Sequence, residues 1–179
     1  MSGEASPRPG AHRGCLIIWC VVALALIGLS LVLARRDAAQ PRSGPAPDFT
    51  LTAYDGKTIT LSGLRGQVVV VNFWASWCGG CADEAPDLER AWQDYRHQGA
   101  MFVGVDYGDS DAEGRKFIEQ HGITYPNGPD LGNRISNVYA IPGVPETFII
   151  DRQGKIVFYA LRPLSFEELS AEIEKLLSR

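Results

Sequence analysis

The sequence predicts an α/β domain built on a central mixed β-sheet that is flanked by helices and covered on both faces. Two apolar runs, 68–74 and 101–106, are rich in apolar and β-branched residues and show no alternation, which is typical of strands buried on both faces. Each run is followed by apolar residues at helical spacing. A hairpin and a helix then close the chain, so parallel and antiparallel strands are expected in one sheet.

Turn and cap residues set the remaining boundaries of this domain. Glycine-containing turns join strand-like runs into two hairpins, over 49–61 and 146–160. A helix follows each buried strand, and the second of these is expected to begin with Asp111 as its N-cap. Ser165 and Glu168 have the spacing of a capping box, which places the start of the last helix there.

The first 47 residues differ in composition from the rest of the chain. Residues 1–14 are polar and predicted to be a disordered tail. Residues 15–34 carry no charge, and 20 helical residues at about 1.5 Å each just span a ~30 Å hydrocarbon core, so a transmembrane anchor is predicted. Residues 35–47 form an expected Pro/Ala-rich linker, and 48–179 form the domain. A cleaved signal peptide ending at Ala34 is the alternative.

Charge narrows the choice of partners. The region 45–179 has 12 Lys/Arg and 19 Asp/Glu, a net charge of −7. This charge argues against nucleic acid or an anionic membrane surface as a partner. Arginines lie on both sides of the apolar run and do not decide its orientation. Disulfide chemistry favours the extracytoplasmic side for the domain.

The chemistry is expected at Cys78 and Cys81, which lie between the buried strand 68–74 and an acid-rich, helix-compatible stretch. A helix N-terminus carries unpaired N–H groups and partial positive charge, which stabilise a thiolate and lower the thiol pKa from its usual value of about 8.5. Only the thiolate attacks a disulfide. Cys78 is therefore the predicted nucleophile, and Cys81, one turn further on, is the predicted resolving thiol.

Two structural roles for the pair are alternatives. A zinc site needs a second pair of ligands, but Cys15 and Cys20 lie in the apolar run and the three histidines are scattered. A purely structural disulfide would close a very short ring and constrain little of the chain. The order of strand, CxxC and helix therefore favours a redox role.

The segment 73–81 resembles the active-site segment of thioredoxin, and the wider chain resembles the membrane-anchored TlpA/ResA/CcmG (DsbE) branch of that superfamily. The wider resemblance covers residues 46–177 and rests on these motifs: Pro47-Asp48-Phe49, Asp55-Gly56-Lys57, Glu84 with Pro86, Gly143 to Asp151, and Gly154-Lys155. It implies a thioredoxin-like fold with an N-terminal β-hairpin extension, preceded by one transmembrane helix.

The same resemblance implies a function. Members of the TlpA/ResA/CcmG (DsbE) branch are extracytoplasmic thiol–disulfide oxidoreductases, and several reduce apocytochrome c during cytochrome c maturation. The resemblance therefore implies a single-pass protein of the cell membrane, with a Cys78–Cys81 redox disulfide in place of a cofactor or metal. It also implies protein thiols and disulfides as substrates and a membrane thiol as the donor of electrons.

The resemblance also assigns roles to individual residues. Pro145 falls on the family's cis-proline, beside which the backbone of Val144 would pair with an extended substrate. Glu84 falls on an acidic residue that would exchange a proton with Cys81, the alternative being a first-turn glutamate favoured by the helix dipole. Trp77 would shield Cys78 and contact the partner. Glu146 would add to the acidic environment, the alternative being a solvated residue at the start of a strand.

This sequence departs from the family pattern at two places, and two other functions of the same fold are alternatives. Asn72 replaces a buried aspartate of thioredoxin, and Gly79-Gly80 replaces a pair that commonly contains proline. A thiol peroxidase of the same fold needs a threonine where this chain has Ala75. A copper carrier of this fold uses a wider cysteine spacing and a distant histidine.

Overall fold

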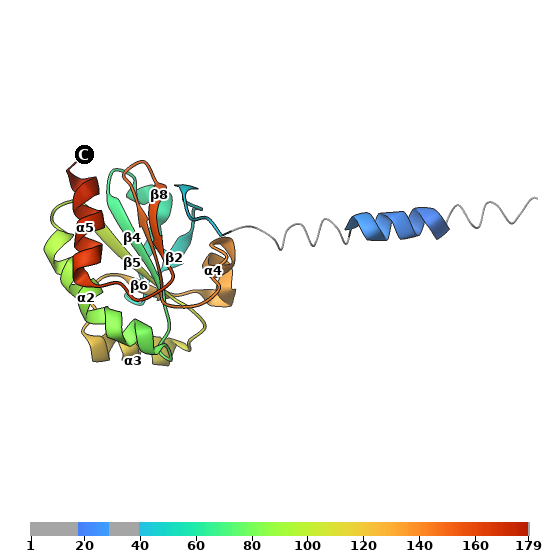
Figure 1. Ribbon diagram of the computed structural model, residues 1–179. Coiled ribbons are helices and arrows are strands. Elements are labelled where there is room, and N and C mark those ends of the chain that lie inside the picture. Colours follow the sequence, from blue (N-terminus) through green and yellow to red (C-terminus); the bar gives the residue numbers. More distant parts are fainter. Residues whose placement is uncertain (1–17, 29–39, 179) are drawn as a thin grey trace, which may run out of the picture. The chain divides into compact units, whose positions relative to one another are not determined.

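The computed structural model describes residues 18–28 and 40–178, and the chain divides into two units after Ala39 (Figure 1). Residues 18–28 form a helix. Within the described residues, no helix combines the length and the apolar character that crossing a bilayer requires. The rest of the predicted span over 15–34, the predicted tail and residues 35–39 of the predicted linker lie outside the described residues.

The second unit contains a six-stranded mixed sheet with the order β1-β8-β7-β4-β5-β6, and a separate hairpin, β2-β3. β5 is parallel to β4 and β6, whereas the remaining neighbours in the sheet are antiparallel. The elements are β1 (Gly44–Pro45), β2 (Thr50–Thr52), β3 (Thr58–Thr60), β4 (Val68–Trp74), α2 (Gly79–Tyr95), β5 (Ala100–Asp106), α3 (Asp111–His121), β6 (Asn127–Pro129), α4 (Arg134–Val138), β7 (Glu146–Ile150), β8 (Lys155–Ala160) and α5 (Phe166–Leu177).

Strand β4 lies at the centre of the sheet, and all of its residues are buried. Successive side chains of a strand point to opposite faces, so β4 supplies both cores of the domain. Val68 and Val70 pack with α2 and α5 in one core, while Val69 and Val71 pack into the other. The run of valines was therefore correctly predicted to be a strand buried on both faces.

Helices α2, α3 and α5 cover one face of the sheet, and the β2-β3 hairpin with α4 covers the other (Figure 1). On the first face Trp74 stacks on Phe117 with ring centroids 4.6 Å apart. On the second face Tyr139 packs edge-on against Phe148 at 5.0 Å. The predicted mixed sheet with cover on both faces is confirmed, as is the N-terminal hairpin.

Two local expectations differ from the structure. Residues 40–47, expected in the linker, belong to the folded unit, because β1 pairs with the outer edge of β8 and the Ala46 N–H donates to the Gly154 carbonyl. An extended segment can satisfy the backbone groups that an edge strand leaves unpaired. The N-cap of α3 is Ser110 rather than Asp111, because Ser110 forms a capping box with Glu113.

Candidate active site

The two cysteines of the CxxC motif lie where β4 leads into α2. Cys78 is the N-cap of α2, and its Sγ accepts a hydrogen bond from the Cys81 backbone N–H at 3.1 Å. The two residues form a disulfide, with their Cα atoms 5.2 Å apart. Cys78 is 7% exposed and Cys81 is 2% exposed. The first sulfur therefore lies at the positive end of a helix, and the second lies deeper in the fold.

The Val144–Pro145 peptide bond is cis, as the family resemblance implied. Pro145 is buried directly before β7, and its Cδ lies 3.4 Å from the point that a Cβ on Gly80 would occupy. The proline ring thus packs against the helical turn that carries the cysteines. Val144 is half-buried beside it, at the end of the loop that leads into β7.

Glu84 lies one turn beyond Cys81 on the buried face of α2 and is only 2% exposed. Its Oε1 accepts a hydrogen bond from Asn72 Nδ2 at 2.8 Å, and its Oε2 accepts one from the Leu164 backbone N–H at 3.1 Å. Burial raises the pKa of Glu84 from 4.5 to about 7, although the two hydrogen bonds oppose this rise. A carboxyl with such a pKa can give or take a proton near neutral pH.

Asn72 connects Glu84 to β7, a contact that the sequence analysis missed. The Asn72 Nδ2 also donates to Thr147 Oγ1 at 3.0 Å, and all three side chains are buried. Asn72 lies opposite Thr147 in the register of β4 and β7. The sequence marked Asn72 only as the residue that replaces an aspartate, because nothing in its local pattern shows which strand lies beside it.

Glu146 is completely buried, so the alternative that it is a solvated residue at the start of a strand is wrong. Its neighbour Thr147 faces Asn72, and side chains alternate along a strand, so Glu146 points to the opposite face of the sheet from Glu84. There it accepts a hydrogen bond from the Gln40 side chain. Burial raises the pKa of Glu146 to about 7, while the nearby Tyr159 and Gln40 oppose this rise.

Trp77 is 63% exposed and directly precedes the N-cap cysteine. The loop that carries it is held by Asp109, whose carboxylate accepts hydrogen bonds from the Ser76 backbone N–H at 2.6 Å and from Ser76 Oγ at 3.0 Å. The sequence analysis missed Asp109, because the contact joins loops 33 residues apart. An exposed indole on a fixed loop offers a partner a large apolar surface.

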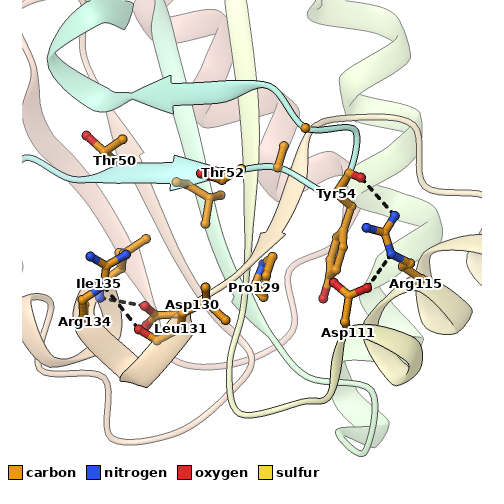
Figure 2. A pocket seen from close by; sticks show the side chains of 13 residues that line it. Thr50, Thr52, Tyr54, Asp111, Arg115, Pro129, Asp130, Leu131, Arg134 and Ile135 are labelled. Carbon is orange, nitrogen blue, oxygen red and sulfur yellow. Dashed lines mark hydrogen bonds and ion pairs between the residues drawn. The ribbon is translucent and has the colours of Figure 1, made fainter.

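A cavity of about 300 Å³ lies beside the β2-β3 hairpin, and none of the residues that line it belongs to the CxxC motif. Figure 2 shows its charged side chains bonded to their neighbours: Arg115 joins the Tyr54 carbonyl and Asp111, and Asp130 accepts from the Ile135 N–H. None of the residues that line the cavity is a cysteine. The groups suited to redox chemistry therefore lie around α2 and β7, away from this cavity.

Comparisons with known proteins agree with this site. The model of the AhpC/TSA family matches residues 43–159. Thiol-disulfide oxidoreductase ResA of Bacillus thuringiensis (strain Al Hakam) is 31% identical over 131 residues, which are 73% of this chain and 76% of that protein. A thiol:disulfide interchange protein of the thioredoxin family from Chlorobium tepidum TLS is similar in structure, with a TM-score of 0.68 and 29% identity, over 78% of this chain and 99% of that chain.

A second solved structure is that of a secreted Mycobacterium tuberculosis disulfide oxidoreductase homologous to E. coli DsbE. It has a TM-score of 0.66 and 25% identity, over 72% of this chain and 96% of that chain. The shared fold and the bonded cysteine pair at the start of α2 agree with these names. The chain belongs to the AhpC/TSA family, and it is a thiol–disulfide oxidoreductase of the ResA/DsbE type.

Proposed function

We propose that this oxidoreductase reduces disulfides of extracytoplasmic proteins, apocytochrome c among them, while residues 15–34 anchor it as a single-pass protein of the cell membrane. The observation that carries the reductase proposal is the arrangement around α2. The bonded Cys78 and Cys81 lie next to cis-Pro145, and the buried Glu84 with its raised pKa follows one turn later. The uncharged run over 15–34 supports the anchor.

The proposed reaction begins with the reduced dithiol. The Cys78 thiolate attacks one sulfur of a substrate disulfide, which forms a mixed disulfide and releases one substrate thiolate. The Cys81 thiol then loses its proton, and its thiolate attacks Cys78 Sγ. The second substrate thiolate leaves, and the Cys78–Cys81 disulfide remains. Two electrons pass to the substrate, so a thiol donor in the membrane must return two electrons before the next cycle.

Glu84 is proposed to take the proton that Cys81 loses. Its position one turn after Cys81 on the buried face of α2 and its raised pKa support this role. Val144 is proposed to pair its backbone with an extended substrate strand beside Pro145, with Trp77 contacting the substrate from the other side of the disulfide. The half-buried Val144 and the exposed Trp77 are accessible for these contacts.

Trapping of mixed disulfides tests the assignment of the two thiols. The Cys81→Ser variant keeps the predicted nucleophile but lacks the resolving thiol, so it should accumulate mixed disulfides with its partners in membranes of the native host. The matched Cys78→Ser variant should trap none. Recovery of apocytochrome c would support a role in its maturation, and a broad set of secreted proteins would instead indicate general reduction. Equal trapping by both variants would contradict the assignment of Cys78.

The membrane proposal needs a separate experiment. The full chain should stay with the membrane during extraction with alkaline carbonate, and its C-terminal domain should be digested by protease added outside intact spheroplasts. Replacing Leu24 and Leu26 by lysine should release the chain, because a charge at the centre of a span costs about 2.5–3.5 kcal/mol. A wild-type chain that carbonate extracts completely would contradict the anchor.

Two assays on the purified chain address the other functions that the fold supports. Peroxide consumption coupled to a dithiol should be absent, because Ala75 has no hydroxyl to activate the peroxide. Titration with Cu(I) should show no tight binding that survives competition by a chelator, because CxxC lacks the wider spacing of the copper carriers. Activity in either assay, without reduction of insulin disulfides, would contradict the reductase proposal.

A further inference from the structure

Two proline rings from distant parts of the chain pack where a side chain on Gly80 would lie. A Cβ added to Gly80 would lie 3.1 Å from Cγ of Pro163 and 3.4 Å from Cδ of Pro145. A Cβ added to the preceding Gly79 would meet nothing within 4 Å. The two glycines of the motif are therefore not equivalent, because only at Gly80 do other residues occupy the space around a side chain.

The loop that carries Pro163 is fixed from both sides. The backbone N–H of the buried Leu164 donates to Glu84 Oε2 at 3.1 Å. Arg162 forms an ion pair with Glu168 in the first turn of α5, with 2.6 Å between Nη2 and Oε1. Ser165 caps the same turn through a hydrogen bond from the Glu168 N–H. Pro163 is thus held against Gly80 by contacts to both α2 and α5.

A proline is well suited to pack over a turn of a helix, as Pro163 does at Gly80. Its ring fixes φ and has almost no rotamer freedom, so holding it in place costs little entropy. Pro163 itself is exposed, whereas Cys81, directly after Gly80, is 2% exposed. The ring therefore marks the boundary between solvent and the turn of α2 that contains the second cysteine.

We propose that Pro163 is a positioning residue that supplies the side chain absent at Gly80 and closes the approach to Cys81. Incoming thiols and disulfides then reach only Cys78, which sets the order of the two attacks. The proposal rests on the proposed function only where it names Cys78 as the nucleophile. It also accounts for Gly80 in this motif, since a larger residue there would have to displace the Pro163 ring.

Alkylation of Cys81 by iodoacetamide tests the proposal in the full-length chain carrying Cys78→Ser. The rate is measured by mass spectrometry of the Cys81 peptide, with added glutathione as the internal standard of thiol reactivity. Adding Pro163→Gly should accelerate alkylation of Cys81 about tenfold, because access to a buried group follows the opening of its cover. Adding Gly80→Ala to that variant should return most of the protection, whereas Gly79→Ala should return none.

Two results would overturn the proposal. One is an alkylation rate for Pro163→Gly within about twofold of its Cys78→Ser parent in a chain that circular dichroism shows to be folded. The other is equal protection by Gly79→Ala and Gly80→Ala. If Pro163→Gly does not fold, Pro163→Ala keeps a Cβ and should give a smaller acceleration of the same sign, and no acceleration would contradict the proposal. The assay needs no electron transfer, so loss of the proposed reductase function would leave its result unchanged.

Discussion

Glu84→Gln is the substitution that best separates chemistry from packing at this site. The amide keeps nearly the shape of the carboxyl and can still accept a hydrogen bond from Asn72 Nδ2 or from the Leu164 N–H. It cannot ionise. The variant therefore removes a titrating group from the buried face of α2 while the surrounding contacts are largely kept.

The magnitude follows from the pKa of the folded chain. Burial raises the pKa of Glu84 from 4.5 to about 7, so the folded chain holds more protons than the unfolded chain between these two pH values. Stability therefore falls as pH rises through this window. This difference between the folded-state and unfolded-state pKa of Glu84 lowers the free energy of unfolding by about 3 kcal/mol once pH exceeds the folded-state pKa. Because Glu84 is buried, solvent screens little of this cost.

The assay is urea unfolding of the oxidised chain at a series of pH values from about pH 4 to about pH 8. The pKa values of Asp106 and Glu146 are also raised to about 7, so both groups change the stability of the wild type in the same pH window as Glu84. Subtracting the curve of Glu84→Gln isolates Glu84. The difference in the free energy of unfolding between the variant and the wild type should be constant below about pH 4.5. It should then shift by about 3 kcal/mol in favour of the variant and level off above about pH 7. Asp83→Asn, on the exposed face of the same helix, is the matched control.

Kinetics gives the same substitution a second readout. If Glu84 takes the proton of Cys81, the variant should resolve mixed disulfides about 10²-fold more slowly, the lower range for general acid–base catalysis. The pH dependence near 7 should also disappear from the resolution step, which stopped-flow fluorescence of Trp77 can follow. A stability difference that does not change with pH, or an unchanged pH profile of resolution, would refute the reasoning.

Three further substitutions test the packing around the site. Asn72→Asp places a second carboxyl against Glu84, so the pKa of Glu84 should rise above its wild-type value. The pH profile for resolution of mixed disulfides should then move to higher pH, and an unmoved profile would contradict the contact between residues 72 and 84. Gly104→Ala puts a Cβ 1.6 Å from Asn127 Oδ1 and should cost about 1–3 kcal/mol or more in urea unfolding; a neutral effect would mean that Asn127 can move. Ser165→Ala removes the N-cap of α5 and should cost about 1 kcal/mol, without changing the alkylation rate of Cys78.

The elements of this domain could be predicted because their signals are local. The valine run of β4, the glycine turn between β7 and β8, and the capping box at Ser165 each act through residues close in sequence. The place of the CxxC motif at the start of a helix was also local information, since it needs only the strand before it and the helix after it.

Other features depended on which distant segments lie side by side. The sequence indicated that residues 40–47 formed a linker, because proline-rich composition does not reveal that an edge strand is free to pair with it. Glu146 looked exposed or close to Glu84, but the alternation of β7 relative to Thr147 sends it to the other face of the sheet. A side chain's face is fixed only when the register of its strand is known.

The sequence by itself determined the class of domain, the cysteine pair and its place at the start of a helix, because a helix N-terminus and its first turn are set by neighbouring residues. Only the tertiary structure decided the environment of that pair: the bonds that hold Glu84, the two proline rings that pack where a Gly80 side chain would lie, and the hydrogen bonds from Ser76 to Asp109. Burial and hydrogen bonding across strands and loops shift a pKa or close an approach, and those contacts exist only after distant segments have packed together.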